Sequence, residues 1–221
     1  MKSNPTTTQP HPARKVNSRQ VTQPAQNAPK VHRGAGEVRI IGGRWRRTKL
    51  AVVSLPGLRP TPDRVRETLF NWLGQSLQGW RCADVFAGTG ALGLEAASRG
   101  ATSVQLCEKD STLVAQLQNH IARLQASQVY LFKGDGLTWL QQQSAGGLDV
   151  VFLDPPFDSP LFLPALKAAA HAVHAQGWVY LEAPQAWSAT ALADVGLTLQ
   201  RHLKAGSVHA HLLRPVVASI A

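Results

Sequence analysis

From residue 81 onward, short apolar segments alternate with segments of helical character, and this alternation constrains the fold more than any other feature. The expected strands cover residues 82–86, 103–107, 129–132, 149–153 and 178–182. The expected helices cover residues 90–99, 111–125, 136–143, 160–175 and 185–194. Strands that are apolar on both faces and separated by helices form a parallel sheet covered on both sides. We therefore predict an α/β fold with five parallel strands.

The end of the chain has a different pattern. Two strand-like segments, LTLQRHL and SVHAHLLRP, are joined only by Lys204-Ala205-Gly206. A parallel crossover needs about a dozen residues or more, so this link is too short for one. The sequence therefore predicts an antiparallel hairpin after the five parallel strands.

The first parallel strand runs into a glycine-rich loop. Gly88, Gly90 and Gly93 match the pattern G-x-G-x-x-G between a strand and a helix, where glycine permits close approach of a ligand to the backbone. The second strand ends at Glu108, whose carboxylate can accept two ribose hydroxyls. NAD and S-adenosylmethionine share that ribose, so these features do not separate the two cofactors. The residues expected at this part of a cofactor site are Asp84, Phe86, Gly88, Thr89, Gly90, Glu108 and Lys109.

The third strand is followed by Asp135 and Gly136. In a doubly wound sheet this loop also lies at the ligand-binding edge. Asp135 could accept the amino group of an adenine, or it could cap the next helix. The sequence leaves both roles open.

The fourth strand runs directly into Asp154-Pro155-Pro156-Phe157. A carboxylate at the end of a central strand lies in the crevice where such sheets bind ligands. Asp154 and a proline carbonyl can accept two N–H bonds from an exocyclic amine, and Phe157 can stack on a planar ring. This combination predicts a site for a nucleobase amine.

Positive charge is concentrated at the front of the chain. The net charge is +10, and residues 1–72 hold 14 Lys and Arg against three acidic residues. A basic segment before a neutral body indicates a polyanionic partner, most simply nucleic acid, although a solubilising tail is an alternative. Residues 1–35 have no acid and almost no large apolar side chain, so we predict a disordered basic tail.

Residues 36–80 are expected to form a hairpin and a helix. VRIIGGRWRRTKLAVV reads as two short strands around a turn, where Arg44, Arg46, Arg47 and Lys49 gather. We expect this turn to lie beside the catalytic crevice. In the next segment Thr61 is the expected helix N-cap, and Gly74 the expected end of the helix.

The motifs together resemble a known family. D-P-P-F is typical of amino-group methyltransferases. RIIGGRWRRTKL, LRPTPDRVRETLFNWL, DVFAGTGALGLEAASRG and KAGSVHAHLL are similar to segments of the bacterial 16S ribosomal RNA guanine-N2 methyltransferases that modify guanine 966. The resemblance covers about residues 37–214.

This resemblance implies a Rossmann-like class I methyltransferase domain at residues 81–221, with a seven-stranded sheet whose last strand is antiparallel. It implies S-adenosylmethionine as cofactor, with Arg59 and Thr61 folded over it. It also implies a cytoplasmic, monomeric enzyme acting on 16S RNA, within the 30S subunit or an assembly intermediate. The expected RNA-binding residues of the segment 36–80 are Arg44, Arg46, Arg47, Lys49, Arg64 and Arg66.

Other features are expected to be structural. Cys82 and Cys107 lie in apolar segments and are predicted to be buried free thiols. We expect no membrane span and no metal, because the histidine pairs lack an acid or cysteine at ligand spacing. Three alternatives remain at this stage: an adenine-N6 or cytosine-N4 methyltransferase, an NAD-dependent dehydrogenase, and a non-catalytic RNA-binding protein.

Overall fold

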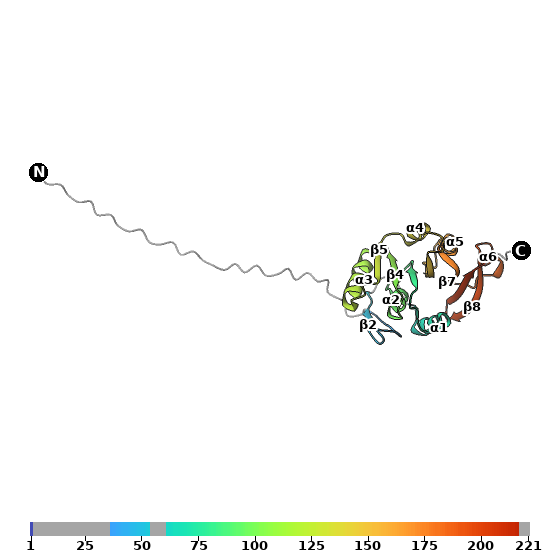
Figure 1. Cartoon of the computed structure of the whole chain (residues 1–221), viewed down its shortest axis with the longest axis horizontal. Helices are drawn as coiled ribbons and strands as arrows, with labels where there is room; N and C mark the ends of the chain where they lie inside the picture. Colours follow the sequence, from blue (N-terminus) through green and yellow to red (C-terminus); the bar gives the residue numbers. More distant parts are fainter. Residues whose placement is uncertain (2–35, 54–60, 217–221) are drawn as a thin grey trace. The chain divides into compact units, whose positions relative to one another are not determined.

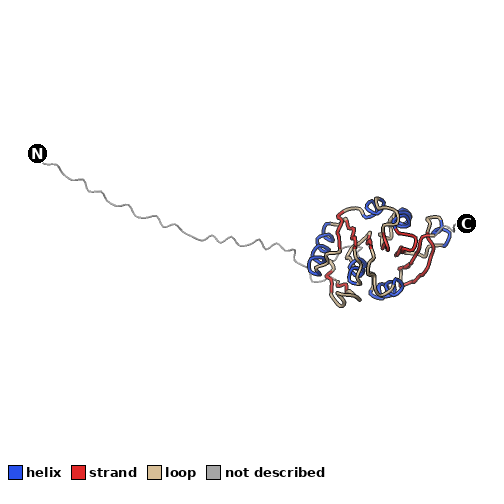
Figure 2. The backbone as a smooth tube through the Cα atoms, viewed as in Figure 1, coloured by secondary structure: helices blue, strands red, loops and turns tan. Residues whose placement is uncertain are grey.

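The structure, a computed structural model, describes Met1, residues 36–53 and residues 61–216. Apart from Met1, the predicted tail of residues 1–35 lies outside this range, as does Arg59. Figures 1 and 2 show the arrangement of the helices and strands.

The main sheet has seven strands in the order β5-β4-β3-β6-β7-β9-β8. The strands from β3 to β7 are parallel, and β9 pairs antiparallel with both β7 and β8. This confirms the predicted α/β fold, the five parallel strands and the terminal hairpin. The seven strands are β3 (Arg81–Asp84), β4 (Ser103–Glu108), β5 (Val129–Lys133), β6 (Leu148–Leu153), β7 (Val173–Ala183), β8 (Leu197–Ala205) and β9 (Val208–Pro215).

Helices cover both faces of this sheet, and each face has its own apolar core. Phe152 and Tyr180 face a core shared with α1, α2, α3 and a separate two-stranded hairpin of β1 and β2. Val151 and Leu181 face a core shared with α4, α5 and α6. The hairpin and α1 therefore share one apolar core with the sheet. The bounds are β1 (Glu37–Arg39), β2 (Lys49–Ala51), α1 (Asp63–Leu73), α2 (Ala91–Ser98), α3 (Ser111–Leu124), α4 (Gly136–Gln141), α5 (Phe162–Ala172) and α6 (Ala189–Ala193).

Several expected element ends differ from the observed ones, among them the strand expected at 178–182, which is Val173–Ala183, and three differences have a clear structural cause. The helix predicted for 160–175 ends at Ala172, because Val173 already pairs with Leu148 of β6. The helix predicted for 185–194 begins only after Ser188, whose hydroxyl accepts from the Ala191 amide at 3.1 Å. Thr61 is not the N-cap of α1. Pro62 occupies that position, and Thr61 is buried instead.

Three remaining expectations concern cysteines, metals and membranes. Cys82 and Cys107 are both buried and free, as predicted. Within residues 36–53 and 61–216, no group of three His, Cys, Asp or Glu side chains could hold a metal ion. None of the helices in the described part of the chain has the length and apolar character needed to cross a membrane.

Candidate active site at the carboxyl edge of the sheet

An acidic residue follows or ends each of the five parallel strands. Across the sheet from β5 to β7 these residues are Asp135, Glu108, Asp84, Asp154 and Glu182. The carboxyl ends of parallel strands meet at one edge, so the topology gathers five carboxyl groups there. Sheets of this kind bind ligands in the crevice outside their carboxyl edge, and carboxyl groups there suit a ligand that carries positive charge and hydrogen-bond donors.

The glycine-rich loop between β3 and α2 lies against Glu108. The Gly88 amide donates to Oε2 of Glu108 at 2.9 Å, and the amides of Lys109 and Asp110 donate to Oε1 at 2.8 Å each. Gly90 precedes α2 with φ of 76°, a left-handed conformation that favours glycine. The predicted residues Asp84, Phe86, Gly88, Thr89, Gly90, Glu108 and Lys109 therefore come from two neighbouring strand ends, with Thr89 buried and Lys109 exposed.

Asp84 ends β3 and is almost completely buried, with 2% of its surface exposed. Its carboxyl accepts the Gly93 amide at 2.9 Å. Burial raises the pKa of Asp84 to about 7, the Gly93 hydrogen bond opposes this, and Glu108 and Glu182 add to it. Asp84 is therefore poised to change protonation when charge enters the crevice.

Asp135 caps α4. Its Oδ1 accepts the Thr138 amide at 2.7 Å, and hydrogen bonds to Thr138 lower the pKa of its carboxyl. The capping role that the sequence left open is thus observed. The side chain is nevertheless exposed at the ligand edge, while Gly136 is buried at the first position of α4.

The Asp-Pro-Pro-Phe segment continues β6 beside the glycine-rich loop. Phe152 pairs with Asp84, and the Val85 amide donates to the Phe152 carbonyl at 3.1 Å. Asp154 thus follows β6 within the crevice. Pro155 is buried, whereas Pro156 is exposed and Phe157 is partly exposed.

The hydrogen bonds of this segment leave two acceptors available. Ser159 donates twice to the Pro156 carbonyl, at 3.0 Å from its amide and 2.6 Å from its hydroxyl. In the described part of the chain, no group donates a hydrogen bond to the Asp154 carboxyl or to the Pro155 carbonyl. Burial raises the pKa of Asp154 well above its ordinary value, with further contributions from Glu182 and Asp84. These acceptors are suited to an incoming N–H donor.

Glu182 is a candidate site residue that the sequence analysis missed. It lies near the end of β7, is 3% exposed, and accepts the Tyr180 hydroxyl at 2.9 Å. Burial raises the pKa of Glu182, and hydrogen bonding by Thr61 and Tyr180 opposes the shift. The available signal was the acid that ends the apolar segment WVYLE, as Glu108 ends the second expected strand.

The basic turn between β1 and β2 is anchored to α2. Buried Glu95 accepts the amides of Ile41 and Gly42 at 2.7 Å each, and the Arg44 amide donates to the Ser98 carbonyl at 2.7 Å. A Cβ at Gly43 would lie 1.9 Å from that Ser98 carbonyl, so only glycine fits this contact.

This anchoring corrects the expected position of the turn. Ser98 is the last residue of α2, whereas the glycine-rich loop precedes Ala91 at its other end. Eight helical residues span about 12 Å. The turn therefore lies about one helix length from the crevice, and the prediction that it lies beside the crevice is wrong.

The prediction that Arg66 contacts RNA is also wrong, because its side chain is completely buried. Its Nη2 donates to Asp63 at 2.5 Å and to the Arg39 carbonyl at 2.8 Å, and its Nη1 lies 3.6 Å from Glu95. A buried guanidinium requires such partners. Arg66 is thus a structural residue that joins the hairpin, α1 and α2, whereas Arg64 is exposed.

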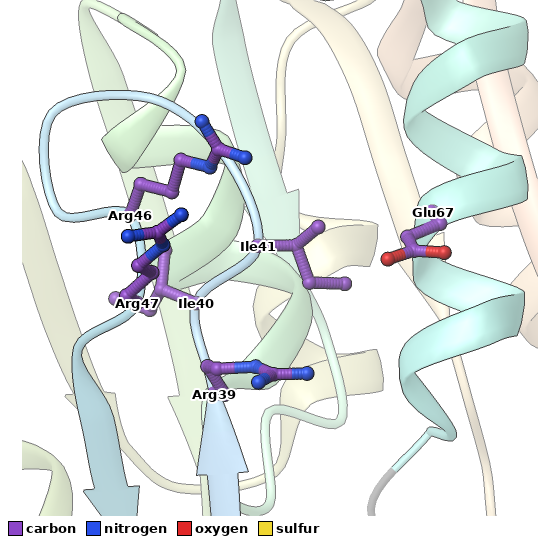
Figure 3. Close-up of a pocket in the computed structure, with 6 residues that line it drawn as sticks. All are labelled: Arg39, Ile40, Ile41, Arg46, Arg47 and Glu67. Carbon is purple, nitrogen blue, oxygen red and sulfur yellow. The ribbon is translucent and has the colours of Figure 1, made fainter.

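A cavity of about 220 Å³ separates the basic turn from α1. Figure 3 shows Arg39, Arg46 and Arg47 on the hairpin side and Glu67 on α1 opposite. In the ranges that the structure describes, Arg44, Arg46 and Arg47 form no ion pair, whereas Lys49 pairs with Glu37 at 2.8 Å. The arginines of the turn are therefore available to an anionic partner.

The strand order, the glycine-rich loop after β3 and the acidic turn after β6 are those of a Rossmann-like class I methyltransferase. A solved structure of a putative methyltransferase from Escherichia coli agrees with this class. It is 37% identical, with a TM-score of 0.68 over 81% of this chain and 98% of that chain. The protein is thus a methyltransferase by fold and by similarity.

The chain belongs to the family described as conserved hypothetical protein 95, which it matches over residues 38–214. It is 44% identical to ribosomal RNA small subunit methyltransferase D of Escherichia coli K12 over 152 residues, 69% of this chain and 74% of the relative. It is 50% identical to the protein of the same name from Haemophilus influenzae over 125 residues, 55% of this chain and 65% of that relative. These relatives confirm the family that the sequence motifs indicated.

Proposed function

We propose that this enzyme transfers a methyl group from S-adenosylmethionine to the N2 amine of a guanine in 16S ribosomal RNA, at the position corresponding to guanine 966. The observation that carries the proposal is the Asp154-Pro155-Pro156-Phe157 segment beside the glycine-rich loop. The names of the relatives support ribosomal RNA of the small subunit as substrate.

The crevice fits S-adenosylmethionine. Glu108 and the loop backbone offer acceptors and close approach for a ribose, and buried Asp84 offers negative charge to a cation. When bound, this cofactor supplies an electrophilic methyl group on a sulfonium. The further residues in the proposed cofactor set are Phe86, Gly88, Thr89, Gly90, Lys109, Asp135, Gly136, Thr61 and Arg59, of which Arg59 lies outside the described residues.

Asp154 and Pro155 would make the guanine amine reactive. The lone pair of N2 is delocalised into the ring, so this nitrogen is a poor nucleophile. Hydrogen bonds from N2 to Asp154 and to the Pro155 carbonyl favour the localised lone pair and strengthen as positive charge develops on nitrogen. Phe157 would stack on the base, and Pro156 fixes the turn that positions it. In this mechanism Asp154 and the Pro155 carbonyl would hold N2 towards the methyl group, and Asp154 would be placed to accept the proton that N2 loses once it is methylated.

The basic turn would bind RNA that flanks the target nucleotide. Arg44, Arg46 and Arg47 are exposed, and Arg47 adopts φ of 69°, a strained conformation of the kind that clusters at functional segments. Because the turn lies about 12 Å from the glycine-rich loop, it would contact a different part of the RNA from the target base. Exposed Lys49 and Arg64 extend this surface. We further propose the 30S particle or an assembly intermediate as substrate of a cytoplasmic monomer.

The test is to incubate the protein with labelled S-adenosylmethionine and 30S particles from a strain that lacks this modification, and to map the labelled nucleotide. We expect the label on N2 of one guanine, and none with Asp154→Asn. The Asp154→Asn protein should still bind the cofactor within a few-fold of the wild-type affinity. Label on adenine N6 or cytosine N4 would refute the guanine assignment and favour the rival nucleic-acid methyltransferase.

A further inference from the structure

Glu182 lies next to Asp154 at the carboxyl edge of the sheet. Leu153 of β6 pairs with Leu181 of β7, so the next residues of the two parallel strands are neighbours. Adjacent strands are about 4.8 Å apart. The two carboxyl groups therefore belong to one site.

The side chains of Asp154 and Glu182 are placed on the same face of the sheet. Phe152 and Tyr180 both contribute to the core that contacts α1 and α2, and their rings lie 6.3 Å apart. Side chains of a strand return to the same face every second residue. Asp154 and Glu182, each two residues further on, continue these two aromatic rows into the crevice.

The partners of Glu182 fix it as a hydrogen-bond acceptor. The Tyr180 hydroxyl donates to its Oε1 at 2.9 Å, and Thr61 hydrogen-bonds to the same carboxyl. The charge of Arg66 on α1 also favours the ionised form of Glu182, but in residues 36–53 and 61–216 Glu182 has no ion pair of its own. A carboxylate offers about four lone-pair sites. Glu182 can therefore accept a further donor.

Guanine differs from the other amine-bearing bases in the group beside its amine. Guanine places the donor N1–H next to its N2 amine, whereas adenine N1 and cytosine N3 place a lone pair next to theirs. Two neighbouring carboxyl acceptors thus match the two neighbouring donors of guanine. They would repel the lone pair of adenine or cytosine.

We propose that Glu182 is a specificity-determining residue that accepts N1–H of the target guanine while Asp154 and the Pro155 carbonyl hold N2. This inference rests on the proposed function, since it concerns the base bound in the same crevice. Tyr180 is then a positioning residue, because its hydroxyl orients the Glu182 carboxyl.

The test compares guanine with 2-aminopurine, which keeps the N2 amine but has a lone pair at N1. Small subunits are reconstituted with 16S RNA that carries either base at the mapped methylation position. Single-turnover methylation rates are measured with the full-length wild type, with Glu182→Gln and with Tyr180→Phe. We expect the wild-type rate on guanine to exceed the rate on 2-aminopurine by roughly tenfold to a hundredfold, because this is the usual effect of losing one charge-assisted hydrogen bond.

Glu182→Gln should lower the guanine preference by about tenfold or more, because the glutamine amide can donate to the N1 lone pair. Tyr180→Phe should lower it by less. The preference is a ratio of rates for one preparation, so a partly unfolded fraction cancels. Asp149→Asn, at the opposite end of β6, is the matched control and should leave the ratio unchanged.

The outcomes separate this inference from the proposed function. If wild type methylates guanine and both variants keep the wild-type preference, Glu182 does not read N1 while the proposed function stands. If Glu182→Gln is inactive on both bases, the result for Tyr180→Phe decides. A lower preference of Tyr180→Phe for guanine over 2-aminopurine supports the inference, and a preference equal to that of the wild type refutes it. If wild type methylates no guanine, the proposed function fails and this inference fails with it.

Discussion

Asp84→Asn should stabilise the protein relative to wild type, and this gain in stability should be larger at neutral pH than at acidic pH. Burial raises the pKa of Asp84 from 3.8 to about 7 in the folded state. Between these values the folded protein holds a proton that the unfolded chain has released, so the contribution of Asp84 to stability falls as pH rises from about 4 to about 7. A difference of roughly three pKa units corresponds to about 4 kcal/mol, reached above pH 7.

Asparagine removes this titration and keeps an oxygen to accept the Gly93 amide. Urea denaturation of both proteins between pH 5 and pH 8 measures the effect. The free energy of unfolding of the variant, relative to wild type, should rise by about 2.5 kcal/mol across this range. In thermal melts this is about 5–10 °C for a domain of this size.

The exposed Asp194, at the end of α6, provides the control, because its carboxyl is not buried. Asp194→Asn should show a constant difference from wild type over the same pH range. A constant difference for Asp84→Asn would show that Asp84 is ionised in the folded protein throughout, and would refute the reasoning.

Four further changes test the site and its surroundings. Arg66→Ala should lower the free energy of unfolding by about 2–5 kcal/mol, because it empties a buried site and removes the donor to Asp63 and to the Arg39 carbonyl, although Glu95 keeps its ion pair with Arg99. Exposed Arg64→Ala should change it by about 0.5 kcal/mol or less; equal losses in urea denaturation would contradict this. Glu108→Ala should weaken S-adenosylmethionine binding by about 1.5–3 kcal/mol in calorimetry, and an unchanged affinity would remove Glu108 from the cofactor site. Replacing Arg44, Arg46 and Arg47 with Ala should lower RNA affinity and reduce the slope of log affinity against log salt by roughly 0.7–0.9 per lost contact. Deleting residues 2–35 should lower the rate of methylation of the 30S particle less than the triple substitution does. A larger loss on deletion would show that residues 2–35 contribute more to RNA binding than the turn does.

The parallel core was predictable because its determinants are local. The apolar strands, the glycine-rich loop and the Asp-Pro-Pro-Phe turn each occupy a short stretch of sequence, and the topology then brings their ends together. Glu182 was within reach of the same logic, because it ends an apolar segment as Glu108 does. It was missed because no local motif surrounds it.

The errors arose where a distant partner decides the structure. Arg66 looks like an exposed cation until Glu95, 29 residues further on, provides a buried countercharge. The position of the basic turn depends on its contact with Ser98, which no pattern near Arg44 indicates. Likewise, the alanine-rich segment that ends at Ala172 predicts a helix continuing to residue 175, but Val173 pairs with Leu148 of β6 and begins a strand.

Binding of S-adenosylmethionine should release protons from the crevice. Burial and neighbouring carboxyls raise the pKa of Asp84 to about 7 and the pKa of Asp154 well above its ordinary value, so Asp84 is partly protonated near neutral pH. A sulfonium beside them favours their ionised forms and lowers those pKa values again. The affinity should therefore rise with pH up to about 7, by at most about tenfold per pH unit for each proton released, and level off above that.

Calorimetry at pH 6.5 in buffers of different ionisation enthalpy measures this release, because the observed heat changes in proportion to the protons transferred to the buffer. We expect release of about half a proton or more with S-adenosylmethionine, on the basis of the raised pKa of Asp84. S-adenosylhomocysteine has a neutral thioether in place of the sulfonium, so it should release fewer protons. Asp84→Asn should reduce the release for the charged cofactor. Heats that do not depend on the buffer, or equal release with both ligands, would mean that the carboxyl groups of the crevice do not respond to the sulfonium charge.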